Sequence, residues 1–431
     1  MSIRSNFQRF RLKLLFMLSI FGPGLITATV DNDSGGIATY SLAGALYGFD
    51  LLWTLVPITI LLIVTMEMSA RLAAVTGQGL ADLLRERFGV KVTFWMLLAV
   101  FFANLGTVLS EFSGIASSFE IFGATIGYPD LFNFLKFVFI PALTYGLWRV
   151  ISDCDYKRIE KLFLLSILFY AAYPISCWIA KPDWGVAMKA LVTPVWRLDA
   201  GYLFTMIAVI GTTITPWMQF YLQSTMIEKG VTTSNWSTAK WDVILGCLTT
   251  DVISFFIIVA CAVTLHGKSE ADTQSVAAIG KALVPLAGAY AGYLFAFGLF
   301  NASVFGAAIL PLSTSFAICE GMGWERGMNK TYEEARFFYG IFFVLLVVGA
   351  ASVLLPGVSV FYLFVMRVSQ FAQGVILPPF LYFLVKLGDD KQLLGKYVNP
   401  PWLSTLSWAS VGVLTIVDFL MLGSALWTLV S

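Results

Sequence analysis

The sequence has little charge and almost no histidine. Only 12% of its 431 residues are Asp, Glu, Lys or Arg, whereas a soluble domain carries about 25%. The formal net charge of +1 gives no electrostatic reason to bind nucleic acid. The single histidine, His266, follows an apolar run. No H-E-x-x-H or G-x-S-x-G pattern is present, so the groups for general acid–base or nucleophilic catalysis are missing. We expect neither an enzyme nor a bound cofactor.

The sequence also has few cysteines. None of the five forms a C-x-x-C pair, and most fall within apolar runs. We expect reduced thiols that serve as packing residues: Cys154, Cys177, Cys247, Cys261 and Cys319.

Long apolar segments are abundant instead. The chain is 58% hydrophobic, with a mean hydropathy of +0.82. About 20 apolar residues cross the hydrocarbon core as a helix. We therefore predict an all-α polytopic membrane protein whose residues 1–431 form a single membrane transport domain. Its eleven expected spans are 23–47, 51–76, 92–122, 131–150, 162–179, 202–227, 241–265, 286–318, 337–355, 358–385 and 403–430.

Lys and Arg are distributed unevenly between the two sets of loops. Residues 1–13 are basic, and most other cationic residues fall in the loops that share their side. The positive-inside rule then predicts a cytoplasmic N-terminus and, after eleven spans, an outside C-terminus. The expected location is the cell membrane. The expected partners are the lipid bilayer and a transported ion, and no obligatory protein partner is evident.

The first expected span carries Asp31-Asn32-Asp33-Ser34-Gly35-Gly36 at its middle. An acidic side chain at the bilayer centre costs at least about 2.5–3.5 kcal/mol on insertion scales. The two glycines weaken the helix at the same place. Carboxylates beside a helix break predict a cation site. The alternative is an external loop between two shorter helices, but residues 23–30 and 37–47 are each too short to span alone.

The sixth expected span has a break of its own. Pro216 removes a backbone donor, and three threonines precede it: Thr212, Thr213 and Thr215. Paired interrupted helices in corresponding halves indicate the site of a secondary transporter. We expect a five-plus-five inverted repeat, with a first repeat at about 14–180, a second at about 200–386 and an extra helix at about 401–431.

Several motifs resemble the Nramp (natural-resistance-associated macrophage protein) family of metal transporters. Its first span is similar to Gly22-Pro23-Gly24 followed by Asp33-Ser34-Gly35-Gly36-Ile37-Ala38-Thr39. The resemblance implies a LeuT-type fold with helices 1 and 6 broken at the midplane. Other segments that match the family are 43–44, 51–53, 70–72, 75–77, 210–211, 221–224, 369–370, 394–395 and 398–399.

The resemblance also implies a metal site. Asp33 matches the family's metal-binding carboxylate, whereas Gly36 stands where the family has Asn and Thr215 where it has Met. Oxygen ligands suit Mg²⁺, Ca²⁺ and Mn²⁺, and a thioether suits softer metals. The chain therefore resembles the Nramp-related magnesium transporter branch, in which Gly stands at the Asn position. The expected metal residues are Asp33, Gly36, Thr215, Thr212, Gln370 and Asp31.

The positions that carry protons in the family are changed. Its span 3 aspartate and two span 6 histidines read Val108, Trp217 and Gln223 here. Histidine is the side chain best suited to titrate near neutral pH. We expect uncoupled import of Mg²⁺, and also of Mn²⁺, as a partly hydrated ion by alternating access. The alternatives are a proton-coupled Mn²⁺/Fe²⁺ importer and, from another class, an amino-acid or amine symporter of the same architecture.

Other polar residues within the spans have less certain roles. Asp251 and Arg367 are expected to be structural partners of other groups, and Glu67 is expected to pair with Arg71 four residues later. Glu111 is either a gate or the partner in an ion pair. The expected pathway or gate residues are Asn32, Ser34, Gln219, Gln373 and Glu111.

Overall fold

The structure is a computed structural model that describes residues 22–267, 289–355 and 361–430. Over these ranges it contains helices and no strands. Ten helical segments of these ranges are long and apolar enough to cross a membrane. The eleventh predicted span, 23–47, is the interrupted first segment, whose helices are each too short to be counted among them. Residues 1–13, 286 and 358, on which parts of the prediction depend, lie outside the described residues.

The first segment is broken where the sequence predicts a break. It consists of α2 (Pro23–Thr29), the short 3₁₀ turn η1 (Val30–Asn32) and α3 (Ser34–Tyr47). Pro23 occupies the first turn of α2, where a missing N–H costs nothing. Asp33 is extended, with φ −69° and ψ −177°, and separates the two helical parts.

The rest of the first half follows the predicted order. The helix α6 is longer at both ends than the expected 92–122, because Gly89 and Gly127, with φ of 84° and 89°, set its limits. The elements are η2 (Leu52–Thr54), α4 (Leu55–Thr76), α5 (Leu80–Phe88), α6 (Val90–Ile126), α7 (Pro129–Asp153), α8 (Tyr156–Ile167), η3 (Leu168–Ala171), α9 (Ala172–Ala180) and α10 (Trp184–Ala190).

The second half begins with the other broken segment. Ile214 and Thr215 leave the helical conformation, and Pro216 then starts a new helix. The elements are α11 (Ala200–Thr213), α12 (Pro216–Glu228), α13 (Trp236–Leu265), α15 (Ala289–Met322), α16 (Arg336–Leu354), α17 (Tyr362–Gly388), α18 (Lys391–Leu394), η6 (Gly395–Tyr397) and α19 (Pro401–Val430).

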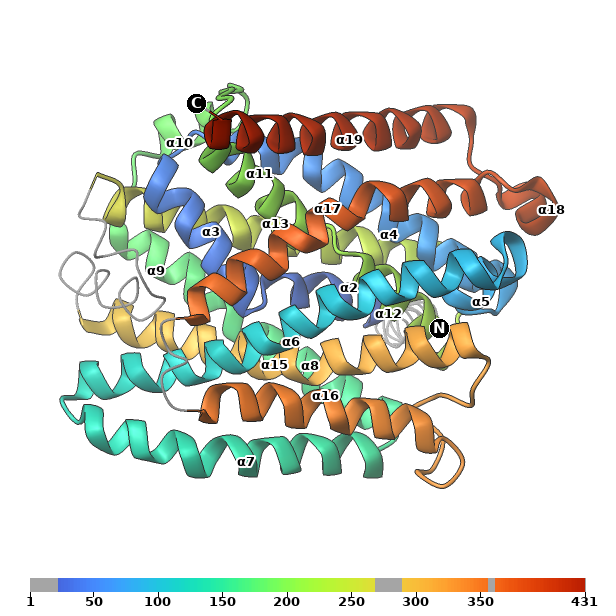
Figure 1. Ribbon diagram of the computed structural model, residues 1–431, viewed down its shortest axis with the longest axis horizontal. Coiled ribbons are helices and arrows are strands. Elements are labelled where there is room, and N and C mark those ends of the chain that lie inside the picture. The colour runs from blue at the N-terminus through green and yellow to red at the C-terminus, as the bar shows by residue number, and fades with distance from the viewer. Residues whose placement is uncertain (1–21, 268–288, 356–360, 431) are drawn as a thin grey trace, which may run out of the picture.

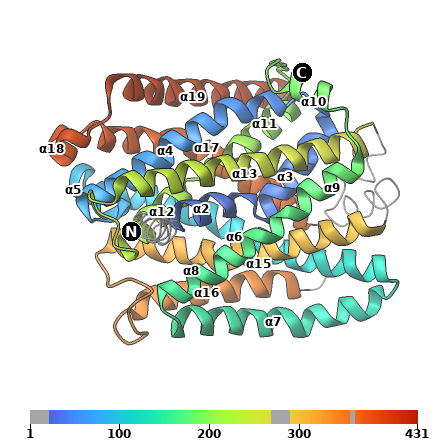
Figure 2. The same cartoon turned by 180° about the vertical axis from the view of Figure 1, so that it is seen from behind.

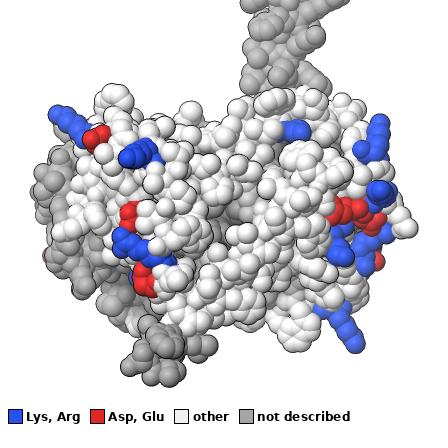
Figure 3. Space-filling view, turned by 90° about the horizontal axis from the view of Figure 1, so that it is seen from above, with Lys and Arg blue, Asp and Glu red and all other residues white. Residues whose placement is uncertain are grey.

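The long helices run side by side, and the broken first segment lies in the middle of them (Figures 1 and 2). It contacts α13 on one side and α6, α11, α15 and α17 on the others. The short helices α5 and α18 lie at one end of the bundle and α10 at the other. Charged side chains gather at these two ends, with an uncharged band between them (Figure 3). This distribution fits a protein whose middle faces lipid.

A carboxylate anchors the start of the first half-helix. Asp242 of α13 is fully buried and accepts hydrogen bonds from the N–H groups of Gly22 (3.0 Å), Gly24 (2.7 Å) and Leu25 (3.2 Å). These are the groups that a helix N-terminus leaves without an internal partner. Asp242 therefore fixes α2 against α13.

Two helices touch through glycine. A Cβ added to Gly211 of α11 would overlap the backbone of Gln370 and Gly374 on α17, and one added to Gly374 would lie 2.5 Å from the Ile207 carbonyl oxygen. The two backbones approach this closely only because neither glycine carries a side chain.

The predicted ion pair and the predicted state of the cysteines are confirmed. Arg71 lies 3.1 Å from Glu67 and also donates to Asn399 at 2.6 Å. All five cysteines are free thiols, and every one except Cys154 is buried.

Candidate metal site at the two helix breaks

Asp33 is the N-cap of α3. Its Oδ1 accepts a hydrogen bond of 2.6 Å from the Gly36 N–H, and the residue is 3% exposed. An N-cap aspartate satisfies N–H groups at the start of a helix. The Asp33 carboxylate thus lies at the break itself, between the two helical parts.

Three oxygens converge beside Gly36. A Cβ added there would lie 3.4 Å from Asp33 Oδ1 and 3.1 Å from Thr212 Oγ1, and the Asp31 carbonyl oxygen is closer still. The glycine thus keeps open the space that these oxygens surround. Asp31 ends the first half-helix, and Thr212 lies on the last turn of α11, so both broken segments supply an oxygen here.

The hydroxyls at the second break have no protein partner. Thr212 is 1% exposed and Thr215 is 2% exposed, and neither Oγ1 makes a hydrogen bond. Buried hydroxyls normally find a partner. Thr215 is the N-cap of α12 but does not cap it with its side chain. Both hydroxyls are therefore free to ligate a cation or to form a hydrogen bond with one of its bound waters.

Gln370 approaches the first break from α17. Its side-chain amide packs against Gly35, where any Cβ would overlap it, and neither its Oε1 nor its Nε2 has a hydrogen-bond partner. The residue is fully buried. An unpaired amide oxygen beside the break is suited to ligate a hard cation.

The side chains of Asp31 and Asn32 point toward α13. Asn32 donates to the carbonyl oxygen of Thr250 at 3.1 Å and to its hydroxyl at 2.5 Å. Asp31 Oδ2 receives only long contacts, from Tyr40 at 3.4 Å and Thr250 at 3.5 Å. Asp31 therefore faces the three-oxygen site through its carbonyl, while its carboxylate lies elsewhere.

Glu111 of α6 forms a hydrogen bond with Ser34, the first residue of α3. Glu111 Oε2 accepts from the Ser34 N–H at 3.2 Å, and the Ser34 hydroxyl bonds that of Ser110 at 3.1 Å. Glu111 lies close enough to Asp33 for the two carboxyl groups to interact. None of the ion pairs among the described residues includes Glu111, so the ion pair considered from the sequence is not present.

Two glutamines expected on the pathway connect neighbouring helices. Gln219 of α12 accepts from Ser69 at 2.8 Å and donates to Thr65 at 3.3 Å. Gln373 of α17 donates to Asn104 at 3.0 Å, while its Oε1 is unpartnered. Gln219 thus holds α12 to α4, and only Gln373 keeps an oxygen free.

The positions that differ from the family's proton path are packed or bonded. Val108 is fully buried against Gly349 of α16. Trp217 is 1% exposed, with no hydrogen-bond partner for its indole N–H. Gln223 donates to the Gln78 carbonyl oxygen at 2.9 Å. None of these side chains exchanges protons near neutral pH.

The site is built from oxygens rather than from clustered acids. Within residues 22–267, 289–355 and 361–430, no three His, Cys, Asp or Glu side chains form a group able to hold a metal. A cation beside Asp33 would have one carboxylate, a main-chain carbonyl, the hydroxyls and waters. Mg²⁺ binds in this way, with one or two carboxylates and several retained waters.

Residues that sequence reasoning did not identify surround the break. Tyr40 bonds Thr213 at 2.7 Å and reaches Asp31, and Thr250 and Ser254 hold Asn32. Tyr40 is two turns into α3, but nothing in its own sequence neighbourhood marks it. The α13 hydroxyls are identified only once the helices are assembled.

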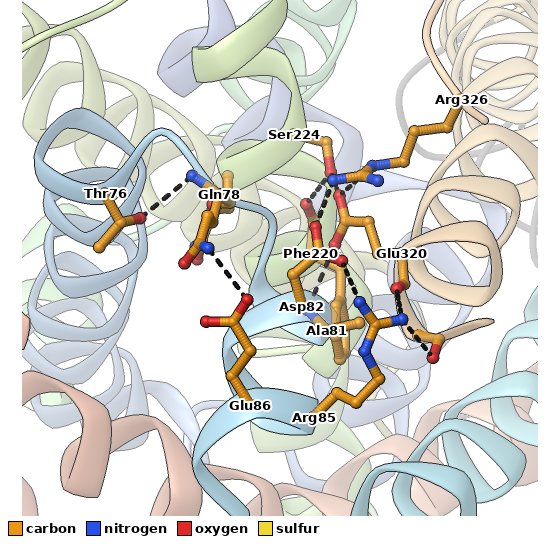
Figure 4. A network of polar contacts seen from close by, with 12 residues as sticks. Thr76, Gln78, Ala81, Asp82, Arg85, Glu86, Phe220, Ser224, Glu320 and Arg326 are labelled. Atoms are coloured by element: carbon orange, nitrogen blue, oxygen red, sulfur yellow. Dashed lines mark hydrogen bonds and ion pairs between the residues drawn. The ribbon is translucent and has the colours of Figure 1, made fainter. Parts of the chain in front are cut away.

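A second polar network lies at the end of the bundle near α5 (Figure 4). Glu320 of α15 is fully buried and accepts from Ser224 at 2.6 Å and from the Ala81 N–H at 3.2 Å. Arg326 lies 3.3 Å from Glu320 and also pairs with Asp82. The network joins α12, α5 and α15 at this end.

The chain is similar to known proteins over most of its length. Residues 24–424 match the family model described as natural resistance-associated macrophage protein-like. The chain is 23% identical, over 95% of both sequences, to the divalent metal cation transporter MntH of Klebsiella pneumoniae. A variant of the Eremococcus coleocola manganese transporter superposes with a TM-score of 0.75 at 19% identity, covering 93% of this chain and 85% of that one. Mhp1, a nucleobase-cation-symport-1 family transporter, superposes with a TM-score of 0.55 at 15% identity, covering 95% of this chain and 92% of that one.

Proposed function

Because this chain belongs to the Nramp family of metal transporters, we propose that it imports Mg²⁺, and also Mn²⁺, across the cell membrane without proton coupling. The chain is a divalent metal cation transporter of this family and not an enzyme. The preference for Mg²⁺, the coupling and the direction of transport are the proposed parts.

The observation that carries the proposal is the set of oxygens around Gly36. Oxygens of Asp33, Thr212 and the Asp31 main chain are the three atoms nearest to the position that a Gly36 Cβ would occupy. Hard oxygen donors favour Mg²⁺ and Mn²⁺ over softer metals. Because Gly36 has no side chain, the space suits an ion that keeps part of its water shell.

The transport route follows from the two breaks. The end of the first half-helix and the last turn of α11 offer oxygens to the same point. In transporters built from inverted repeats, such discontinuous helices bind the ion near the bilayer midplane while the surrounding helices rock. Thr215 and Gln370, both with unpaired oxygens, are proposed as further ligands or as partners of bound water.

The absence of coupling is proposed from Val108, Trp217 and Gln223. None of these side chains gains or loses a proton near physiological pH. Import would then depend on the metal gradient and the membrane potential, which is worth about 4.6 kcal/mol per 100 mV for two charges. The rival function is proton-coupled Mn²⁺ import, and the observation that favours it is the retained Glu111 beside Asp33, whose Oε1 has no hydrogen-bond partner.

The test is uptake of Mg²⁺ into liposomes that contain the purified full chain, with indicators for Mg²⁺ and pH inside. We expect uptake without internal acidification, and uptake near background for Asp33→Ala. Asp418→Ala, a matched change of an acid on α19, should transport like the wild type. Acidification that follows Mg²⁺ uptake would refute uncoupled transport, and uptake by Asp33→Ala would refute the site.

The amino-acid symporter of the other class predicts a different result. A substrate carboxylate would have to approach Asp33 and Glu111, which repel it. Calorimetry with Mg²⁺ and with amino acids separates the two functions, because only the bound substrate releases or absorbs heat.

A further inference from the structure

Asp251 is a buried acid without a compensating charge. It lies in the middle of α13, is 5% exposed, and neither of its carboxylate oxygens makes a hydrogen bond, although Thr59 of α4 is near enough to interact. The described residues contain no ion pair to it, so the structural partner expected from the sequence is not found. An unpaired carboxylate at this depth is expensive and usually marks an ion path.

The carboxylate of Asp31 faces the same region. Its Oδ1 has no partner, and its Oδ2 has only the two long contacts from Tyr40 and Thr250. Thr250, whose hydroxyl makes one of these contacts, precedes Asp251 directly on α13. The carboxylate of Asp31 thus lies at the turn of α13 that carries Asp251, whereas its carbonyl oxygen lies beside Gly36.

The backbone break holds this arrangement in place. Asn32 donates to Thr250 and accepts from Ser254 at 2.9 Å, so η1 is fixed to the turn of α13 that carries Asp251. The hydroxyl of Tyr40 lies beside Asp31 and bonds Thr213. The two unpaired carboxylates and these hydroxyls therefore lie around the same turn of α13, where two negative charges with no cation between them would repel each other.

We propose that Asp31 and Asp251, with the hydroxyls of Tyr40 and Thr250, form a second site for a divalent cation beside the Asp33 site. One ion with two positive charges neutralises the pair, and carboxylate and hydroxyl oxygens suit a hard ion. The buried thiol of Cys247, one turn earlier on α13, is near both carboxylates. This inference rests on the proposed function and gives the substrate ion a second position along its route.

The test is Mn²⁺ binding to the purified full chain, measured by equilibrium dialysis and by electron paramagnetic resonance. We expect two bound Mn²⁺ ions per wild-type chain, with spectral broadening from their mutual interaction. Asp251→Asn should retain one ion, lose the broadening and bind the second ion about 100-fold or more weakly, since removal of even an outer-shell partner costs about 10–100-fold. Asp33→Asn should retain the ion at Asp31 and Asp251.

Two further variants, Asp418→Asn and Asp31→Asn, serve as controls. Asp418→Asn makes the same chemical change on α19 and should still bind two ions. If Asp251→Asn does not fold, Asp31→Asn replaces it, because that variant keeps the carbonyl that faces the first site. One wild-type ion, removed by Asp33→Asn and unaffected by Asp251→Asn, would overturn the second site and leave the proposed function standing. Wild-type protein that binds no ion and transports none would instead overturn the proposed function.

Discussion

Replacing Asp242 with alanine is expected to detach the first half-helix from α13. The carboxylate accepts from the N–H groups of Gly22, Gly24 and Leu25, all within 3.2 Å. In the alanine variant these donors lose their partner in a region from which water is excluded. The direct consequence is a less stable fold in which α2 is held only by its apolar contacts.

The expected loss of free energy of unfolding follows from the number of N–H groups that are left without an acceptor. A buried N–H without an acceptor costs about 1–3 kcal/mol. Three donors that share one carboxylate should together cost about 3–6 kcal/mol, because such contributions are not fully additive. Asp242→Asn keeps the shape of the side chain and one acceptor oxygen, so its free energy of unfolding should lie between those of the wild type and of Asp242→Ala.

The measurement is unfolding by SDS in mixed micelles, followed through the fluorescence of the 13 tryptophans. Asp183→Ala is the matched control, since Asp183 accepts from Gly185 at 2.9 Å and Val186 at 3.2 Å but is exposed to solvent. Asp183→Ala should lower the free energy of unfolding by about 1 kcal/mol, as the loss of an ordinary N-cap does. If Asp242→Ala destabilises the protein no more than this control does, the anchoring role is wrong.

Three further substitutions test other parts of the structure. Gly36→Ala places a methyl group against the Asp31 carbonyl oxygen and beside the other two site oxygens, so it should reduce Mn²⁺ affinity at least about tenfold in dialysis and also lower the melting midpoint; unchanged affinity would contradict the site. Gly79→Ala drives a Cβ into the Glu320 carboxylate and should destabilise the protein by about 1–3 kcal/mol, so an unchanged melting midpoint would show that the network near α5 is loosely packed. Arg71→Ala leaves Glu67 without its partner in a buried setting and should cost about 3–5 kcal/mol in the SDS titration, whereas removing both charges together should cost less.

The order of the helices and the positions of the two breaks could be predicted, because the length of an apolar segment and the presence of a helix-breaking residue are local features of the sequence. The first segment occupies the expected 23–47, between Pro23 and Gly48, whose φ is 59°. Pro216 starts α12 for the same reason that it was expected to interrupt the span. Both breaks are therefore properties of a few neighbouring residues.

The directions of the site side chains could not be predicted in the same way. Asp31 and Asp33 are two residues apart, yet the 3₁₀ turn between them directs their carboxylates to different surroundings. The partners that decide the direction of the Asp31 carboxylate are Tyr40, nine residues further along the chain, and Thr250 on α13. Glu111 was considered as half of an ion pair, but no described cation reaches it, because its nearest polar groups come from the broken helix.

The glycine contact between α11 and α17 limits how the protein moves. Helices whose main chains touch cannot slide along each other without a steric clash, and any side chain at Gly211 or Gly374 would push them apart. These two helices should consequently rotate as one body during the transport cycle. The flexing then falls to the unwound residues after Thr213, so that the second break would act as a hinge besides its proposed part in holding the ion.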